Sequence, residues 1–168
     1  MTIDTRNLVA KPTAEDLKRQ FDADPATFIR LVKPALKFVY KTRSKQKNAS
    51  KTLWKYETGS HTVIIANPKD VIAHTAPGQQ VTTLDKPNRN RITVPGTNYT
   101  REFKIAQHSL AGGFLDAPTL SYSDHGELGF VDGRHRTALA ATLGITEIPF
   151  YIELDDLKFV KFPFHRAK

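Results

Sequence analysis

Apolar and polar positions follow two clear patterns towards the end of the chain. Residues 128–131 form a short apolar run of β-formers, which predicts a strand buried on both faces. Residues 136–143 are rich in alanine and leucine, and Gly144 follows where a left-handed helix C-cap is expected, which predicts a helix of about two turns. Residues 148–152 return to a strand pattern. The predicted unit is therefore strand, tight turn, helix and strand, with the turn at the carboxyl end of the first strand.

The preceding part of the chain carries signals of the same two kinds. Residues 62–66 are rich in β-branched side chains and predict a strand, and Pro68 has the position of a first helical residue. Residues 101–111 have a helical pattern. Residues 119–122 and 127–131 predict a hairpin across a polar turn. Helices and strands thus occur along the whole region, which favours an α+β fold.

The first 60 residues predict a helical extension. Thr13 has the position of an N-cap before one helix, and Asp24-Pro25 has the cap-then-proline order that begins a second. Pro34 should kink or divide the second helix. Its apolar residues recur at helical spacing, which favours docking of this helix on the main sheet. These residues are Phe28, Val32, Leu36 and Val39.

Three segments have less regular patterns. Residues 53–56 contain a tryptophan and a tyrosine on either side of Lys55, and they predict a hairpin with residues 62–65. Aromatic rings beside cations also suit stacking on a nucleotide or nucleic-acid base. Residues 78–100 are rich in Pro, Gly, Asn and Thr, which indicates an insertion that serves as a binding loop or lid, or is disordered. Residues 157–164 predict an edge strand or a strap over the core.

Basic residues are concentrated at the start of the chain. The net charge is +8, and residues 1–60 hold 13 Lys or Arg against 6 Asp or Glu, a net +7 that leaves +1 for residues 61–168. A basic run gives salt-dependent affinity for phosphates without base specificity, so DNA or another polyanion is the predicted partner. Nine basic residues, with no acidic residue between them, carry this prediction: Arg30, Lys33, Lys37, Lys41, Arg43, Lys45, Lys47, Lys51 and Lys55.

Composition narrows the class of protein. A length of 168 residues with 39% hydrophobic content fits one compact domain, over residues 61–168, preceded by the basic helical extension over residues 1–60. The chain has no cysteine, which excludes a disulfide and a thiolate metal site. No apolar run approaches the roughly 20 residues of a membrane helix, and the first residues lack a secretory pattern. A cytoplasmic protein without a membrane partner is therefore expected.

The turn between the predicted strand and helix carries the candidate chemistry. Gly133 allows positive φ and close approach of the backbone to a ligand, Arg134 and Arg136 add permanent charges, and His135 adds a titratable donor. The helix start itself favours an anion. Asp132 would repel a phosphate unless it holds a divalent cation, orients an arginine or accepts a proton. In the plainer alternative, Asp132 caps the helix and the arginines form a solvated cluster.

Residues 130–138, together with residues 143–145 and 147–149, resemble the signature of the ParB/sulfiredoxin superfamily, also called the ParB-like nuclease domain. The turn, the alanine-rich helix, the Leu-Gly-Ile stop and the Ile-Pro strand all occur in the family's order. The resemblance covers about residues 62–153, with an insertion at residues 78–100. It implies a small mixed β-sheet flanked by helices, with the glycine and arginine turn around the phosphates of a nucleotide.

Two differences from the family pattern narrow the set of members that this chain resembles. Sulfiredoxins carry a catalytic cysteine at the position of Arg134, so the absence of cysteine excludes their chemistry. Partition ParB proteins continue with a further motif and a helix-turn-helix domain, whereas this chain has Asp155-Asp156-Leu157 there, so partition function is not expected. The remaining members include free-serine kinases, proteins of DNA-modification systems, and a plasmid oncogenic-suppression protein that resembles an ATPase and DNase.

The sequence therefore predicts a nucleotide-binding, nucleic-acid-associated NTPase or nuclease. ATP or another nucleoside triphosphate is the expected cofactor, together with Mg²⁺ held by Asp132. Asp132 and His135 are the candidate catalytic residues. Two alternatives stay open: a small-molecule or nucleoside kinase similar to the free-serine kinases, and a non-catalytic plasmid- or phage-encoded binder of DNA or protein. The candidate phosphate-binding residues are Gly113, Gly133, Arg134, His135, Arg136 and Thr137.

Overall fold

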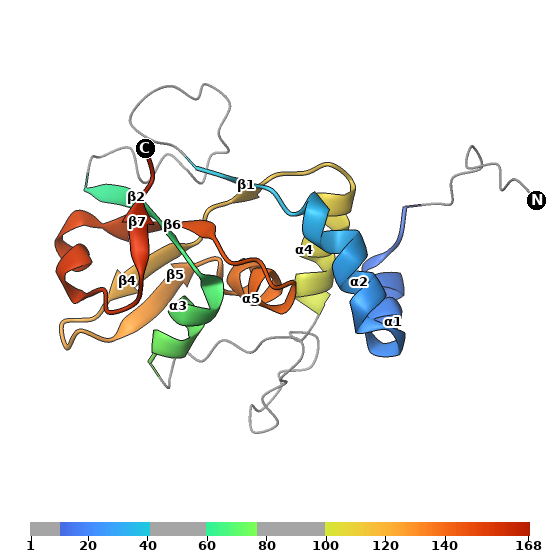
Figure 1. The fold of residues 1–168 in the computed structure, drawn as a ribbon, viewed down its shortest axis with the longest axis horizontal. Coiled ribbons are helices and arrows are strands. Elements are labelled where there is room, and N and C mark those ends of the chain that lie inside the picture. Colours follow the sequence, from blue (N-terminus) through green and yellow to red (C-terminus); the bar gives the residue numbers. More distant parts are fainter. Residues whose placement is uncertain (1–10, 41–59, 77–99) are drawn as a thin grey trace, which may run out of the picture.

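The computed structural model describes residues 11–40, 60–76 and 100–168, and it confirms the predicted α+β class (Figure 1). The helices are α1 (Ala14–Ala23), α2 (Pro25–Val32), α3 (Pro68–His74), α4 (Thr100–Leu110) and α5 (Arg134–Thr142), with the 3₁₀ helices η1 (Lys33–Ala35) and η4 (Leu154–Phe159). The strands are β1 (Phe38–Val39), β2 (His61–Ala66), β3 (Leu115–Asp116), β4 (Thr119–Tyr122), β5 (Leu128–Asp132), β6 (Ile148–Glu153) and β7 (Phe164–Arg166).

Five strands form the main sheet, in the order β5-β4-β6-β2-β7. The sheet is mixed, because β4 runs parallel to β6 while the other neighbouring pairs are antiparallel. β6 pairs with β2 from His61 opposite Glu153 to Ala66 opposite Ile148. β6 is the central strand, and residues 148–152 are all buried, which explains their apolar run.

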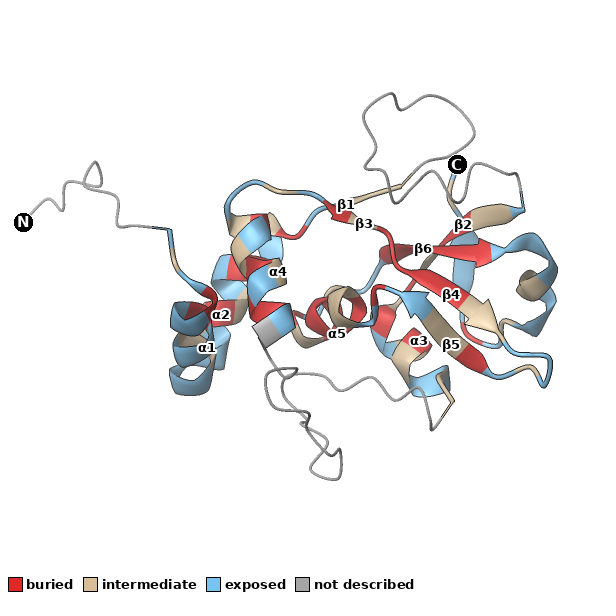
Figure 2. Ribbon diagram, turned by 180° about the vertical axis from the view of Figure 1, so that it is seen from behind, coloured by how far each residue is buried: buried red, intermediate tan, exposed pale blue. Residues whose placement is uncertain are grey.

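Helix α5 lies between the sheet and a cluster formed by α1, α2 and α4 (Figure 1 and Figure 2). It contacts both α3 and α4, and residues 137–141 are buried because small and strongly helix-forming side chains fit the core. Three aromatic rings, with centroids 5.3 to 6.0 Å apart, fill the helix cluster: Phe21, Phe28 and Phe103. None of the described helices is long and apolar enough to cross a bilayer.

Capping signals place the first helices where the sequence predicts them. The Thr13 hydroxyl accepts from the Asp16 N–H, and the Asp16 carboxylate accepts from the Thr13 N–H, which together form a capping box for α1. Asp24 caps α2, and Pro25 takes its first position. As predicted, the helix is interrupted at Pro34, which lies in η1, because proline lacks the N–H of a helical hydrogen bond.

The N-terminal extension is not helical throughout, which corrects the prediction for Val39. The chain is extended at Leu36, and Phe38–Val39 forms β1, which pairs in parallel with β3. Phe28, Val32 and Leu36 are buried in the same core cluster as residues of the main sheet. However, α2 packs mainly on α1 and α4 rather than on the sheet.

Strand β5 is an edge strand, so the prediction that it is buried on both faces is wrong. Leu128 is buried, but Val131 is 62% exposed and Asp132 is also exposed. The apolar run identified the strand correctly, yet burial depends on its neighbours, and in the main sheet only β4 pairs with it. The exposed end of β5 leads directly into α5, which places the turn at the surface.

Three further predictions concern the C-terminal segment, the partner of β2 and the insertion before α4. The edge strand β7 begins only at Phe164, the last residue of the segment predicted as an edge strand or strap, and pairs with residues 64–66, whereas residues 157–159 of that segment belong to η4. Residues 53–56, the predicted hairpin partner of β2, lie outside the described residues. So does the predicted insertion, except that α4 already begins at Thr100.

Candidate functional site

The turn between β5 and α5 is built around Gly133. Its φ of 86° lies in the left-handed region, as predicted, and a Cβ at this position would lie 2.6 Å from the Cβ of Pro118. Gly133 is the N-cap residue of α5, and no side chain among the described residues caps the helix. The N–H groups of the first turn and the positive end of the helix dipole are therefore available to an anion.

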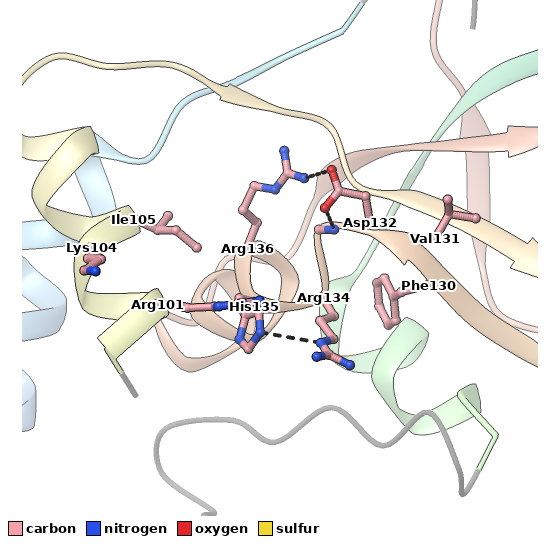
Figure 3. Close-up of a pocket in the computed structure, with 10 residues that line it drawn as sticks. Arg101, Lys104, Ile105, Phe130, Val131, Asp132, Arg134, His135 and Arg136 are labelled. Atoms are coloured by element: carbon pink, nitrogen blue, oxygen red, sulfur yellow. Dashed lines mark hydrogen bonds and ion pairs between the residues drawn. The ribbon is translucent and has the colours of Figure 1, made fainter. Parts of the chain in front are cut away.

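A pocket of about 530 Å³ lies between this turn, α4 and the end of β5 (Figure 3). Four of its side chains are permanently cationic and only one is a carboxylate, so the pocket attracts anions. The lining residues are Arg101, Lys104 and Ile105 from α4, Phe130, Val131 and Asp132 from β5, and Gly133, Arg134, His135 and Arg136 from the turn and α5.

Arg136 and Asp132 form a bridge within the protein. One terminal nitrogen of Arg136 donates to Asp132 Oδ2 and the other to the backbone carbonyl of Asp116 in β3, each at 2.6 Å. The Asp132 Oδ1 atom accepts from the Gly133 N–H at 2.7 Å. Asp132 thus orients an arginine, one of the three roles that its position beside a phosphate site allows. It does not cap α5, which removes that part of the plainer alternative.

Three cations of the pocket remain for a ligand. Arg101, Lys104 and Arg134 are exposed, and none of them forms an ion pair with a carboxylate of the described residues. Figure 3 shows Arg101 extending from α4 toward His135. The Arg134 Nε atom lies 3.5 Å from His135 Nε2. Positive charge in the pocket therefore exceeds what Asp132 neutralises.

The pocket histidine has a buried partner. His135 Nδ1 lies 2.7 Å from Glu102 Oε1, and the two side chains are 21% and 6% exposed. Glu102 comes from the first turn of α4, so this contact ties α4 to the start of α5. Its other oxygen, Oε2, is buried and has no hydrogen-bond partner in the described part of the chain.

One wall of the pocket is apolar. Ile105 and Phe130 are half-buried, and Val131 is among the most exposed large apolar residues of the described chain. The pocket therefore combines cations and helix N–H groups with apolar surface, as sites for phosphate-bearing organic ligands do.

Two predicted phosphate-binding residues do not line this pocket. Thr137 is fully buried, and its hydroxyl donates to the Gly133 carbonyl at 3.1 Å. A Cβ at Gly113 would lie 2.1 Å from the imidazole ring of His108, so this glycine makes room for a side chain rather than for a ligand. The other predicted residues line the pocket together: Asp132, Gly133, Arg134, His135 and Arg136.

The structure describes three of the nine basic residues predicted to bind nucleic acid. Arg30, Lys33 and Lys37 are all exposed. The Lys33 ammonium donates to the Gly144 carbonyl at 3.0 Å, so it also satisfies the C-terminal end of α5. The other six residues lie outside the described residues: Lys41, Arg43, Lys45, Lys47, Lys51 and Lys55.

Helix α4 supplies residues that the sequence analysis did not assign to the site. Arg101, Lys104 and Ile105 have the i, i+3, i+4 spacing of one helix face, a signal that the sequence contains. Nothing local indicates that this face meets the turn, since Glu102 and His135 are 33 residues apart. Phe130 was assigned only to a strand.

The residues at the turn do not form a protein-built metal site. Both carboxylate oxygens of Asp132 already accept hydrogen bonds, from Gly133 and Arg136. The described residues hold no group of three His, Cys, Asp or Glu that is arranged for a metal ion. Each of these oxygens keeps a second lone pair, so the role of Asp132 as an Mg²⁺ ligand stays a prediction.

Comparisons with known proteins give no match to this chain among protein-family models, curated proteins or solved structures. The resemblance of residues 130–149 to the ParB/sulfiredoxin signature thus stays an expectation from the sequence.

Proposed function

We propose that this protein binds a nucleoside triphosphate in the pocket at the start of α5 and hydrolyses a phosphoanhydride or phosphodiester bond in association with nucleic acid. The observation that carries the proposal is the gathering of Arg101, Lys104 and Arg134 around the uncapped start of α5. Cationic donors and helix N–H groups bind phosphate oxygens through charge-assisted hydrogen bonds. The resemblance to the ParB/sulfiredoxin turn supports the same class of ligand.

The pocket also suits the remainder of a nucleotide. Its volume of about 530 Å³ is in the range of small-molecule sites. Ile105, Phe130 and Val131 offer apolar surface beside the cations, and an aromatic ring can stack on a base with about 1–3 kcal/mol of stabilisation. Inorganic phosphate would contact only the polar part of this pocket, so a nucleotide is the better fit.

His135 is the candidate acid and base for the reaction. In hydrolysis, a water oxygen bonds to phosphorus, the bond from phosphorus to the leaving oxygen breaks on the opposite side, and the water proton passes to the imidazole, which releases it to solvent. Arg101 and Arg134 would stabilise the charge on the phosphoryl oxygens. Mg²⁺ would enter with the phosphates of the nucleotide, since that ion is commonly held by few protein ligands.

Titration calorimetry with ATP and CTP, with and without Mg²⁺, tests the binding part of the proposal. Arg134→Ala should weaken binding at least tenfold, because a charge-assisted pair typically contributes about 1.5–3 kcal/mol. Arg166→Ala is the matched control, since Arg166 is an exposed arginine in β7, at the opposite edge of the sheet from β5. Equal affinity in wild type and Arg134→Ala would place the nucleotide elsewhere.

Product analysis then separates the enzyme classes. Release of inorganic phosphate from ATP or CTP supports an NTPase, and cleavage of a supercoiled plasmid supports a nuclease. Transfer of the phosphoryl group to a hydroxyl acceptor would instead favour the kinase alternative. Nucleotide binding without any of these reactions would favour a non-catalytic binder that keeps the anion pocket.

A further inference from the structure

A buried carboxylate holds the histidine of the pocket. Glu102 Oε1 lies 2.7 Å from His135 Nδ1. We propose that Glu102 is a positioning residue that keeps the proton of neutral His135 on Nδ1, and so leaves the Nε2 lone pair for proton transfer in the pocket. The tautomer is inferred from this contact alone, whereas its use in catalysis rests on the proposed function.

The chemistry of the two groups decides which of them donates. An ionised carboxylate only accepts hydrogen bonds, so Nδ1 carries the proton, and a neutral imidazole then has its lone pair on Nε2. The Arg134 Nε–H group, which can only donate, lies 3.5 Å from Nε2 and is compatible with a lone pair there. Glu102 is in the first turn of α4, near the positive end of the helix dipole.

Burial of Glu102 is not explained by the stability of the fold. Its side chain is 6% exposed, and Oε2 has no hydrogen-bond partner among the described residues. A buried carboxylate oxygen without a partner disfavours folding, and a buried charged pair is often no more stabilising than apolar side chains of similar size. A group placed where it does not favour folding is typical of a functional site.

The position of His135 in the pocket explains how this tautomer would act in catalysis. His135 lines the pocket beside the three cations that would hold a phosphate, and Glu102 does not line it. In the reaction proposed above, Nε2 takes the proton from the attacking water and then releases it to solvent, while the Nδ1 proton stays between the ring and Glu102. Glu102 remains ionised and stabilises the imidazolium that forms between the two transfers.

The tautomer is measured directly by long-range ¹⁵N–¹H correlation NMR of the full-length chain, at a pH where the ring is neutral. The His135 signals are identified by their loss in His135→Gln. We expect protonated Nδ1 and bare Nε2 in the wild type, and a shift toward protonated Nε2 in Glu102→Met, which removes both oxygens and keeps a helix-forming side chain of similar length. Glu102→Gln keeps a neutral acceptor and should show a smaller shift.

The matched control is Glu147→Met, because Glu147 is exposed and does not line the pocket. It should leave the His135 signals unchanged. A proton on Nε2 in the wild type, or the same tautomer in wild type and Glu102→Met, overturns the proposal. If Glu102→Met does not fold, Glu102→Gln decides in its place, and an unchanged tautomer there, together with an unchanged pH profile of the reaction, overturns the positioning role.

Kinetics test the catalytic use of the tautomer. With ATP and CTP as the probes, kcat for phosphate release in Glu102→Met should fall on the order of 10²-fold, the usual contribution of general acid–base catalysis, with little change in KM. A lowered melting temperature with unchanged kcat would show that Glu102 is only structural. If the wild type hydrolyses neither nucleotide, the proposed hydrolysis fails, and the NMR result still decides whether Glu102 positions His135.

Discussion

Gly133 and Arg136 fix the turn between β5 and α5 from its two ends. Gly133 brings the backbone against Pro118, and Arg136 reaches from α5 to the Asp116 carbonyl and to Asp132. Both residues act within the protein, so replacing either of them changes folding as well as ligand binding. Arg134 is exposed and forms no ion pair with a carboxylate of the described residues. Replacing Arg134 is therefore the better test of ligand binding in the pocket.

Gly133→Ala should lower the free energy of unfolding by about 2–5 kcal/mol, because the left-handed conformation costs about 1–2 kcal/mol and overpacking a further 1–3 kcal/mol. Gly112→Ala is the matched control. Gly112 has a φ of 87°, against 86° at Gly133, but a Cβ at Gly112 would meet no atom within 4 Å. Urea denaturation should therefore show the smaller loss for Gly112→Ala, and equal losses would mean that contact with Pro118 is unimportant.

Arg136→Ala should lower the free energy of unfolding by about 1–3 kcal/mol, because it leaves the Asp116 carbonyl and the Asp132 carboxylate without their arginine. The loss is smaller than that of a buried ion pair, because Asp132 is 55% exposed and solvent screens its charge. Arg134→Ala should leave stability within about 0.5 kcal/mol. Urea denaturation of the two variants checks the difference, and a stable Arg136→Ala would show that the bridge contributes little to folding.

At the scale of elements, the capping box of α1 makes a pH-dependent contribution to stability. Hydrogen bonds from the backbone N–H and the hydroxyl of Thr13, and from Arg19, hold the pKa of Asp16 below its ordinary value of 3.8. Since the pKa is lower in the folded state, this stabilisation is complete above pH 3.8 and is lost as the pH falls through the folded-state pKa.

Asp16→Asn should therefore be less stable than the wild type at neutral pH, and the difference should narrow at a pH below 3.8, the ordinary pKa of this carboxyl. Urea denaturation at both pH values measures it. Asp124→Asn, in the exposed turn between β4 and β5, is the control and should show no comparable pH-dependent difference. A difference that persists at low pH would mean that the charge of Asp16 is not what stabilises α1.

The elements that the sequence predicted correctly are those with local signals. The Thr13 cap, Pro25, Pro68 and Gly144 each mark a helix end through the conformation or hydrogen bonds of that residue alone, and the structure places helix ends at all four. The turn at Gly133 follows from the same local chemistry, because its φ is positive. Most of the pocket's turn was therefore predictable.

The features that were missed depend on contacts between distant segments. The apolar run of β5 did not show that the strand lies at a sheet edge, because edge position depends on which strands pair. Val39 continued an apolar spacing but pairs with β3 instead. The contact of Glu102 with His135 joins two helices across 33 residues, and no spacing within either helix indicates it.

At the scale of the whole molecule, positive charge is divided between the pocket and the N-terminal region. Residues 61–168 have a net charge of only +1, yet the pocket gathers four of their cations around one carboxylate. The remaining excess lies in residues 1–60, with a net charge of +7. We therefore expect two separable activities: a ligand of defined shape in the pocket, and a polyanion bound by charge through the basic run.

Reversing three charges of the basic run tests this separation. The variant Lys41→Glu, Lys45→Glu and Lys47→Glu should weaken DNA binding, measured by fluorescence anisotropy from roughly 50 to 200 mM NaCl, and reduce the slope of log K against log salt by about 2–3 if these lysines contact phosphates. ATP binding should be unchanged. Arg134→Ala should show the reverse result, with DNA binding kept and ATP binding weakened. Loss of both activities in either variant would mean that one surface binds both ligands, with the nucleic acid entering the pocket at the start of α5.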